Sequence, residues 1–333
     1  MEKVAFTLLF LLLWVSCQED LDEVEERCVD KKIGITGSVL PMDSESSLRT
    51  SMSGSTASFV SGDALGVSET LTQRYNQKFT YNGTAWIPAN AMYWYNGTST
   101  HTFYAYYPYN SNSQSLQAAI PVLNSQVVGV APDPACDFLM SASKTQARSA
   151  GTNVAFTFTH AFSLLQFNIK MNILGLGLTL YNLQSVTLTG GNTSGTPYGL
   201  VNKANAVSQI YYNQSTRALQ YPVNTSSTLS QTYTSNTISS VNIGNSTSMS
   251  IYVFILPGTY TYPSAAGPTV SFKVSLAGLV SLASTQKLET ATFLPGTKYV
   301  YQVTIGLLPI LADTQVKLIR EEPMPCEVRR CIP

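Results

Sequence analysis

The chain has 333 residues, a formal net charge of zero, and 44% hydrophobic but only 11% charged residues, where globular proteins average about a quarter. This balance permits a sizeable core but supplies no basic cluster, which excludes nucleic-acid binding. Carboxylates are absent from residues 138 to 288, and His101 and His160 are the two histidines. Because acid–base catalysis and hard-metal sites need such groups, we expect no enzyme, no metal and no cofactor.

The N-terminus has the pattern of an export signal. Lys3 precedes an apolar run from Val4 to Val15, which is too short for a bilayer core that needs about 20 apolar residues. The run ends in Ser16-Cys17 and resembles a bacterial lipobox, with Trp14 where leucine is usual. We therefore expect a signal peptide at 1–16, cleavage between Ser16 and Cys17, and a palmitate-bearing lipid on Cys17. An ordinary secretory peptide with a chance cysteine is the alternative.

Carboxylates dominate the segment that follows Cys17, residues 18–30. Such a block cannot bury enough apolar surface to fold, so we expect residues 17–30 to form a solvated tether. The segment also resembles the acidic export signal of surface lipoproteins in Bacteroidetes, which implies the outer face of the cell outer membrane. A plain spacer that faces the periplasm is the alternative.

Four cysteines remain beyond Cys17, namely Cys28, Cys136, Cys326 and Cys331. An even number in an oxidising compartment permits disulfides, here with three connectivities. Cys326 and Cys331 are near enough in sequence to close a small loop, which makes them the candidate disulfide; a Cys28–Cys136 bridge is less favoured. Zinc is disfavoured because the spacing is not C-x2-C and no histidine lies nearby.

Hydrophobic residues alternate with period two in several segments, which indicates strands with one buried face. The clearest runs are 33–40, 154–158, 165–171, 270–276 and 299–305, and turn dipeptides occur at Asn82-Gly83, Asn96-Gly97, Pro257-Gly258 and Pro295-Gly296. No stretch has the pattern of an amphipathic helix. The sequence therefore predicts an all-β chain of antiparallel sandwich or barrel-like domains with Greek-key connections.

The polar stretch at 144–152 precedes the strand at 154–158, so we place a domain boundary there. This gives an N-terminal β-sandwich domain at 31–150, a C-terminal one at 151–320, and a polar tail at 321–333. Within the second domain, residues 201–250 are rich in Asn, Ser, Thr and Gln. We expect that region to form long surface loops or exposed edge strands.

Four local patterns, in this order, together resemble the fimbrillin family of Bacteroidetes, the subunits of type V pili. They are Leu48-Arg49-Thr50 followed by 59–67, the aromatic strand 103–108 that ends in Tyr-Pro, the strand–histidine–alanine pattern at 156–163, and the hairpin at 293–301. The resemblance implies two tandem transthyretin-like β-sandwiches, delivered to the cell surface as a lipoprotein.

The resemblance also implies an assembly mechanism. A trypsin-like protease cuts after Arg49, before Thr50, and removes the first strand, predicted at 33–40; the groove then accepts a strand from the next subunit. This strand addition is head-to-tail and builds a filament. The polar C-terminus departs from the usual family ending, so the donor strand would lie upstream, within 303–319. Partners would be other pilus subunits, the outer membrane through the lipid, and host or bacterial surface ligands.

Two alternatives remain open at this point. Arg49 is a plain surface arginine in one of them, and the lipid stays on an anchor or tip subunit. In the other, the chain is a surface glycan-binding lipoprotein of a polysaccharide-uptake system, with Trp86, Trp94 and the 104–109 tyrosine cluster as stacking platforms. Against the second, Tyr104 and Tyr106 share one face of a predicted strand and Tyr107 the other, as in a half-buried strand.

Two polar residues invite a functional interpretation but fit structural roles better. His160 ends a predicted strand, where a hydrogen-bonded packing histidine is the expected case. Asp63 follows Gly62 in a predicted turn, where aspartate is favoured because its side chain bonds the local backbone. We expect both to be structural.

Overall fold

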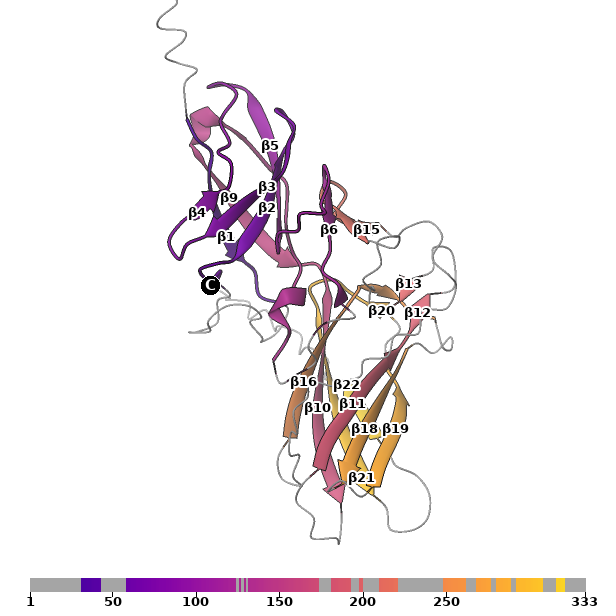
Figure 1. The fold of residues 1–333 in the computed structure, drawn as a ribbon. Coiled ribbons are helices and arrows are strands. Elements are labelled where there is room, and N and C mark those ends of the chain that lie inside the picture. Colours follow the sequence, from indigo (N-terminus) through magenta and orange to yellow (C-terminus); the bar gives the residue numbers. More distant parts are fainter. Residues whose placement is uncertain are drawn as a thin grey trace, which may run out of the picture.

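The computed structural model describes residues 31–42, 58–123, 126, 129, 131–173, 181–192, 198–199, 210–220, 248–261, 268–276, 280–288, 292–307 and 316–320. Within these residues the regular elements are β-strands together with short 3-10 turns, among them η2 (Pro134–Cys136) and η3 (Arg148–Ala150), and no α-helix occurs. The predicted all-β fold class is confirmed (Figure 1).

A large mixed sheet forms the upper part of Figure 1. Its strand order is β1-β9-β7-β5-β2-β3-β4, and β8 pairs with β5. The strands are β1 (Gly34–Val39), β2 (Ala64–Glu69), β3 (Arg74–Tyr81), β4 (Trp86–Pro88), β5 (Thr100–Tyr107), β7 (Leu139–Ser141), β8 (Lys144–Ala147) and β9 (Asn153–His160).

β1 is bonded on two sides. It runs parallel to β9 from the pair Gly34–Asn153 to the pair Val39–Phe158. On the other side Ile33 N donates to Met92 O at 2.8 Å, and Trp94 N donates to Lys31 O at 3.2 Å. The start of β1 therefore lies between β9 and the segment 92–94.

β9 is a strand of this first sheet, paired with β1 and β7, although we expected it to open the second domain. The polar stretch at 144–152 contains β8 and η3, which also belong to the upper part. The chain leaves the first sheet only after His160 and enters β10 (Ser163–Ile173) through Ala161 and Phe162. Polarity at 144–152 marks a connection between two strands of one sheet.

Two further sheets form the lower part of Figure 1. One has the order β16 (Ser248–Ile255), β10, β21 (Lys298–Leu307), β22 (Val316–Arg320). The other has the order β11 (Tyr181–Thr189), β18 (Thr269–Leu276), β19 (Val280–Lys287). Phe167 of β10 contacts Phe272 of β18, with ring centroids 5.4 Å apart. The two sheets therefore pack face to face, and the predicted strands at 165–171, 270–276 and 299–305 are confirmed.

Short strands form three small sheets among the described residues. β6 (Gln117–Ala119) pairs with β14 (Tyr211–Asn213), which pairs with β15 (Ala218–Gln220). β17 (Gly258–Thr259) pairs with β20 (Thr292–Phe293), and β12 (Gly191–Asn192) with β13 (Tyr198–Gly199). The β6–β14 pairing joins segments from the two halves of the sequence.

The buried hydrophobic residues form two clusters. The smaller fills the first sheet and includes Ile33, Ile35 and Val39. The larger begins under the first sheet at Tyr106 and Phe138 and continues through the lower sheets. Met42, two residues after the exposed Leu40, is 2% exposed and belongs to this larger cluster. The segment 33–42 is thus held in both cores.

Met42→Ala is expected to lower the free energy of unfolding by about 2 kcal/mol, because a buried methionine side chain is lost. This value lies at the lower end of the range for replacing a large buried aliphatic side chain by alanine, since Met42 enters the core from a connecting segment. Chemical denaturation measures it. The matched control is Leu40→Ala, which alters a side chain that is 49% exposed and should change the stability little; equal effects would contradict the role of Met42.

Candidate functional site

Metal-binding constellations do not occur in the part of the chain that the structure describes. No group of three or more His, Cys, Asp or Glu residues lies close enough together there to hold a metal ion. Among the same residues, no helix has the length and hydrophobicity needed to cross a membrane. The features that remain are the β1 segment, a hollow beside it, and several buried polar groups.

The β1 segment has the features of a replaceable strand. Ile33, Ile35 and Val39 are 3%, 5% and 8% exposed and point into the smaller core, whereas Thr36 and Ser38 are exposed. Its backbone bonds extend to Leu40 N, which donates to Phe158 O at 2.8 Å. Without β1, the edge of β9 and the segment 92–94 would carry unpaired backbone groups above an apolar trough.

The predicted cleavage residues, Arg49 and Thr50, lie outside the described residues, in the interval 43–57 that follows β1. Ser16, Cys17, Cys28, Cys326 and Cys331 also lie outside, so the lipidation and the Cys326–Cys331 disulfide stay predictions. Cys136 is described: it is buried at the end of η2. Two of the predicted turn glycines are confirmed: Gly83 lies in a bend and Gly296 in a turn, and both have positive φ. Gly258 also has positive φ but lies in β17.

The two ends of the predicted donor segment 303–319 lie in different environments. Its first part lies in β21, which is bonded to β10 on one side and β22 on the other. Its last part lies in β22, the final strand in the order of that sheet. The β21 portion is therefore enclosed in the sheet, whereas β22 lies at its edge.

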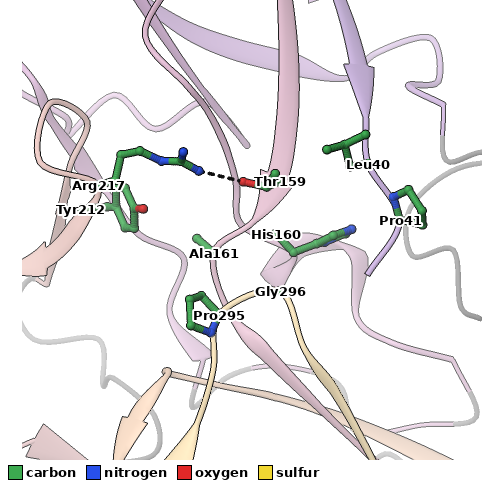
Figure 2. A pocket seen from close by; sticks show the side chains of 9 residues that line it. All are labelled: Leu40, Pro41, Thr159, His160, Ala161, Tyr212, Arg217, Pro295 and Gly296. Atoms are coloured by element: carbon green, nitrogen blue, oxygen red, sulfur yellow. Dashed lines mark hydrogen bonds between the residues drawn. The ribbon is translucent and has the colours of Figure 1, made fainter. Parts of the chain in front are cut away.

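A hollow of about 560 Å³ lies where the first sheet meets the lower part (Figure 2). Figure 2 shows Arg217 and His160 on opposite sides of the strand end at 159–161, and Arg217 Nη2 donates to Thr159 Oγ1 at 3.1 Å. The lining residues are Leu40, Pro41, Thr159, His160, Ala161, Tyr212, Arg217, Pro295 and Gly296. The two lining residues before Met42 come from the segment that carries β1.

His160 and Asp63 have the structural roles predicted for them. His160 is buried, and its Nδ1 lies 2.7 Å from Oδ1 of the fully buried Asp137. Asp63 accepts a hydrogen bond from Val60 N at 2.9 Å and another from the Tyr107 hydroxyl at 2.8 Å. No sequence motif links Asp137 to His160, so this partner could not be predicted from the sequence.

A second buried pair, Glu69 and His101, was also missed. Glu69 Oε1 accepts from Leu71 N at 2.5 Å and Oε2 from Thr72 N at 2.9 Å, so the carboxylate fixes the turn after β2. Tyr95 N donates to His101 Nε2 at 3.2 Å. An Nε2 that accepts leaves the proton of a neutral ring on Nδ1, which lies 3.0 Å from Glu69 Oε1.

Tyr106 is the polar centre of the region below the first sheet. Its hydroxyl lies 2.7 Å from both Asn76 Oδ1 and Ser113 Oγ and accepts from Asn110 N at 3.1 Å. Burial raises the pKa of Tyr106 to about 12, against the opposing hydrogen bond of Ser113. The protein therefore favours the neutral phenol strongly over the phenolate.

This raised pKa predicts a loss of stability at high pH. The unfolded chain gives up the Tyr106 proton near pH 10 and the folded chain near pH 12, so the contribution is complete below pH 10 and lost as the pH rises to 12. The expected loss is about 3 kcal/mol. Denaturant unfolding between pH 9 and 12 measures this loss. Tyr106→Phe should remove this contribution to the fall of the free energy of unfolding with pH. Tyr95→Phe, at a side chain that is 65% exposed, should keep it; an unchanged slope in Tyr106→Phe would contradict the assignment.

The expected glycan-stacking platforms at Trp86 and Trp94 are wrong, because these rings are 7% and 5% exposed and belong to the smaller core. The predicted orientation within 104–109 is confirmed: Tyr106 lies in the larger cluster and Tyr107 in the smaller. Neither of these two tyrosines presents a ring face to solvent.

A family model described as Fimbrillin-like matches residues 50–318. No curated protein matches the chain significantly. Among solved structures, a candidate cell adhesion protein from Bacteroides uniformis is 20% identical with a TM-score of 0.55, over 88% of this chain and 98% of that one. One from Bacteroides ovatus is 17% identical with a TM-score of 0.57, over 88% and 96%. A fimbrial protein from Bacteroides vulgatus is 15% identical with a TM-score of 0.50, over 88% and 98%.

Proposed function

Because the chain belongs to the fimbrillin-like family, we propose that it is a cell-surface pilus subunit that polymerises by strand exchange after a cut between Arg49 and Thr50. The observation that carries this proposal is the position of β1. It precedes Arg49 in the chain, fills an apolar trough with three side chains, and is bonded to β9 and to the segment 92–94. A strand with these contacts has the form of an occupant that another strand can replace.

The extent of the family match supports the same cut. The match begins at Thr50, the residue that follows Arg49, and ends within β22. β1 therefore lies outside the matched part, although it is an integral strand of the first sheet. The segment that the cut would remove, residues 1–49, is the part of the chain before the family match, which also ends before residues 319–333.

The predicted lipid fits this scheme as a transient anchor. Cys17 and the acidic tether precede Arg49, so one cut would release both the lipid and β1. An uncut chain would keep the lipid and β1 together and would serve as an anchor or tip subunit on the outer membrane. The state of the Arg49–Thr50 bond thus separates a polymerising subunit from a retained one.

The proposal is tested by treating the purified chain with a trypsin-like protease and determining its oligomeric state. Cutting after Arg49 should yield SDS-resistant oligomers. A chain that is cut there and stays monomeric would contradict polymerisation by strand exchange.

A further inference from the structure

The third inward position of β1 is occupied by a glycine. Counting along the buried face, the four positions carry Ile33, Ile35, Gly37 and Val39. The isoleucines and Val39 fill the core, whereas Gly37, paired with Phe156 in the register, places no side chain there. The trough therefore has three deep positions and one shallow position.

Two aromatic rings occupy the space beside Gly37. A Cβ added to Gly37 would lie 3.1 Å from Phe158 Cε2 and 3.3 Å from Phe59 Cε2, which is tighter than most real Cβ contacts. Phe59 packs edge-on against Trp86, Tyr107 and Phe158, with centroids 5.0, 5.6 and 5.4 Å apart. These surrounding rings leave Phe59 little room to move. A side chain at position 37 that is larger than alanine would therefore overlap the aromatic rings.

Both rings belong to parts of the chain that a cut after Arg49 does not remove. Phe59 follows Arg49 in the sequence, and Phe158 lies in β9. When β1 leaves, the deep positions of Ile33, Ile35 and Val39 become vacant. The shallow position keeps its aromatic floor.

We propose that the trough selects its incoming strand by size at this position, and that it accepts a strand with two large aliphatic residues, then Gly or Ala, then a β-branched residue, at alternate positions. This inference rests on the proposed strand-exchange function and specifies its partner. Alanine is the upper limit because its Cβ needs a shift of only a few tenths of an ångström, whereas any larger residue must displace the rings.

Two segments in the C-terminal part of the chain have this pattern. Val274, Leu276, Gly278 and Val280 form the first, and its described residues lie in β18 and β19, which pair with each other, so it is not free to be donated. The second remains as the candidate. Leu308, Ile310, Ala312 and Thr314 follow each other at alternate positions. β22 does not fit in the corresponding alignment, because Val316 and Leu318 would be followed by Arg320 at the shallow position. We therefore assign the segment 308–314 of a second copy, rather than β22, as the strand whose side chains fit. Pro309 takes the place of Gly34 in this alignment and has no N–H, so the bond from Gly34 N to Thr152 O is the one backbone bond at this position that the donor does not restore.

The experiment uses the chain from residue 18 onward with a site for a specific protease inserted after Arg49, so that the cut does not depend on natural cleavage. The cut protein is separated from its own 18–49 fragment in denaturant and refolded at low concentration with a labelled peptide of residues 31–40, and fluorescence anisotropy measures the binding of this peptide. The Gly37→Val peptide is expected to bind at least about tenfold more weakly, which corresponds to about 1.4 kcal/mol. The matched control peptide carries Thr36→Val on the exposed face and should bind like the original.

Competition then tests the assignment of the donor. An unlabelled peptide of residues 306–316 should displace the labelled peptide, and a peptide of residues 314–324 should not. Equal binding of the Gly37→Val and Thr36→Val peptides would overturn the size rule, and displacement by 314–324 alone would overturn the assignment. If the unmodified 31–40 peptide does not bind at all, the proposed strand exchange itself fails, which is a different result from failure of the size rule.

Discussion

Cutting the purified chain after Arg49 is expected to convert a monomer into a ladder of SDS-resistant oligomers. The cut separates β1 from the rest of the chain, and β1 contributes Ile33, Ile35 and Val39 to the smaller core. An incoming strand would restore both this apolar burial and the backbone bonds to β9. Because each subunit then receives a strand from the next, the contact does not close on itself.

Two controls make this expectation specific. Arg49→Ala should leave the chain intact at this bond and monomeric under the same treatment. Mass spectrometry should place the new N-terminus of the cut chain at Thr50. Oligomers that form equally from the Arg49→Ala chain would show that assembly does not need this cut, and a resistant bond would favour the anchor or tip role.

His160→Ala is expected to lower the free energy of unfolding by about 2–3 kcal/mol, because the buried Asp137 side chain loses its hydrogen-bond partner. The Asp137 carboxylate is fully buried, and His160 Nδ1 lies 2.7 Å from its Oδ1. The pair stands where the chain crosses from the first sheet to the lower sheets. Just beyond it, Gly296 N donates to Phe162 O at 3.0 Å, so the crossing is held from both parts.

Chemical denaturation of three variants tests the pair. The Asp137→Ala/His160→Ala double variant should be less destabilised than the sum of the single variants, because the two effects share one interaction. Thr159→Ala is the matched neighbour: its hydroxyl contacts the exposed Arg217, and its loss should cost under about 1 kcal/mol. A His160→Ala effect no larger than that of Thr159→Ala would contradict a structural role for the pair.

Alternation of apolar residues predicted the strands well, because each has one face in a core. β1, β9, β10, β18 and β21 all coincide with predicted runs. The sheet that each strand joins was harder to predict from the sequence. The polar stretch at 144–152 suggests a domain boundary, yet β8 and η3 lie there and β9 returns to the first sheet. Polarity identifies a connection, but it carries no information on which sheet the next strand joins.

The partners of the buried polar side chains could not be predicted from the sequence, for a related reason. Glu69 and His101 lie far apart in the chain, as do Asn76 and Tyr106, and only the folded register brings each pair together. The glycine at position 37 gave a partial signal, since glycine within a strand often marks a close approach. The identity of the approaching ring, Phe59, follows from the structure alone.

Locking β1 in place tests whether β1 must leave the trough before the chain can assemble. Thr36 and Ala155 are exposed partners in the β1–β9 register, so a Thr36→Cys/Ala155→Cys disulfide should form on the surface without altering the core. We expect the oxidised, locked chain to stay monomeric after cutting at Arg49 and to form oligomers once the disulfide is reduced. The wild-type chain should form oligomers with or without reductant. Equal assembly of the locked and reduced chains would contradict the claim that β1 must leave before another strand can enter.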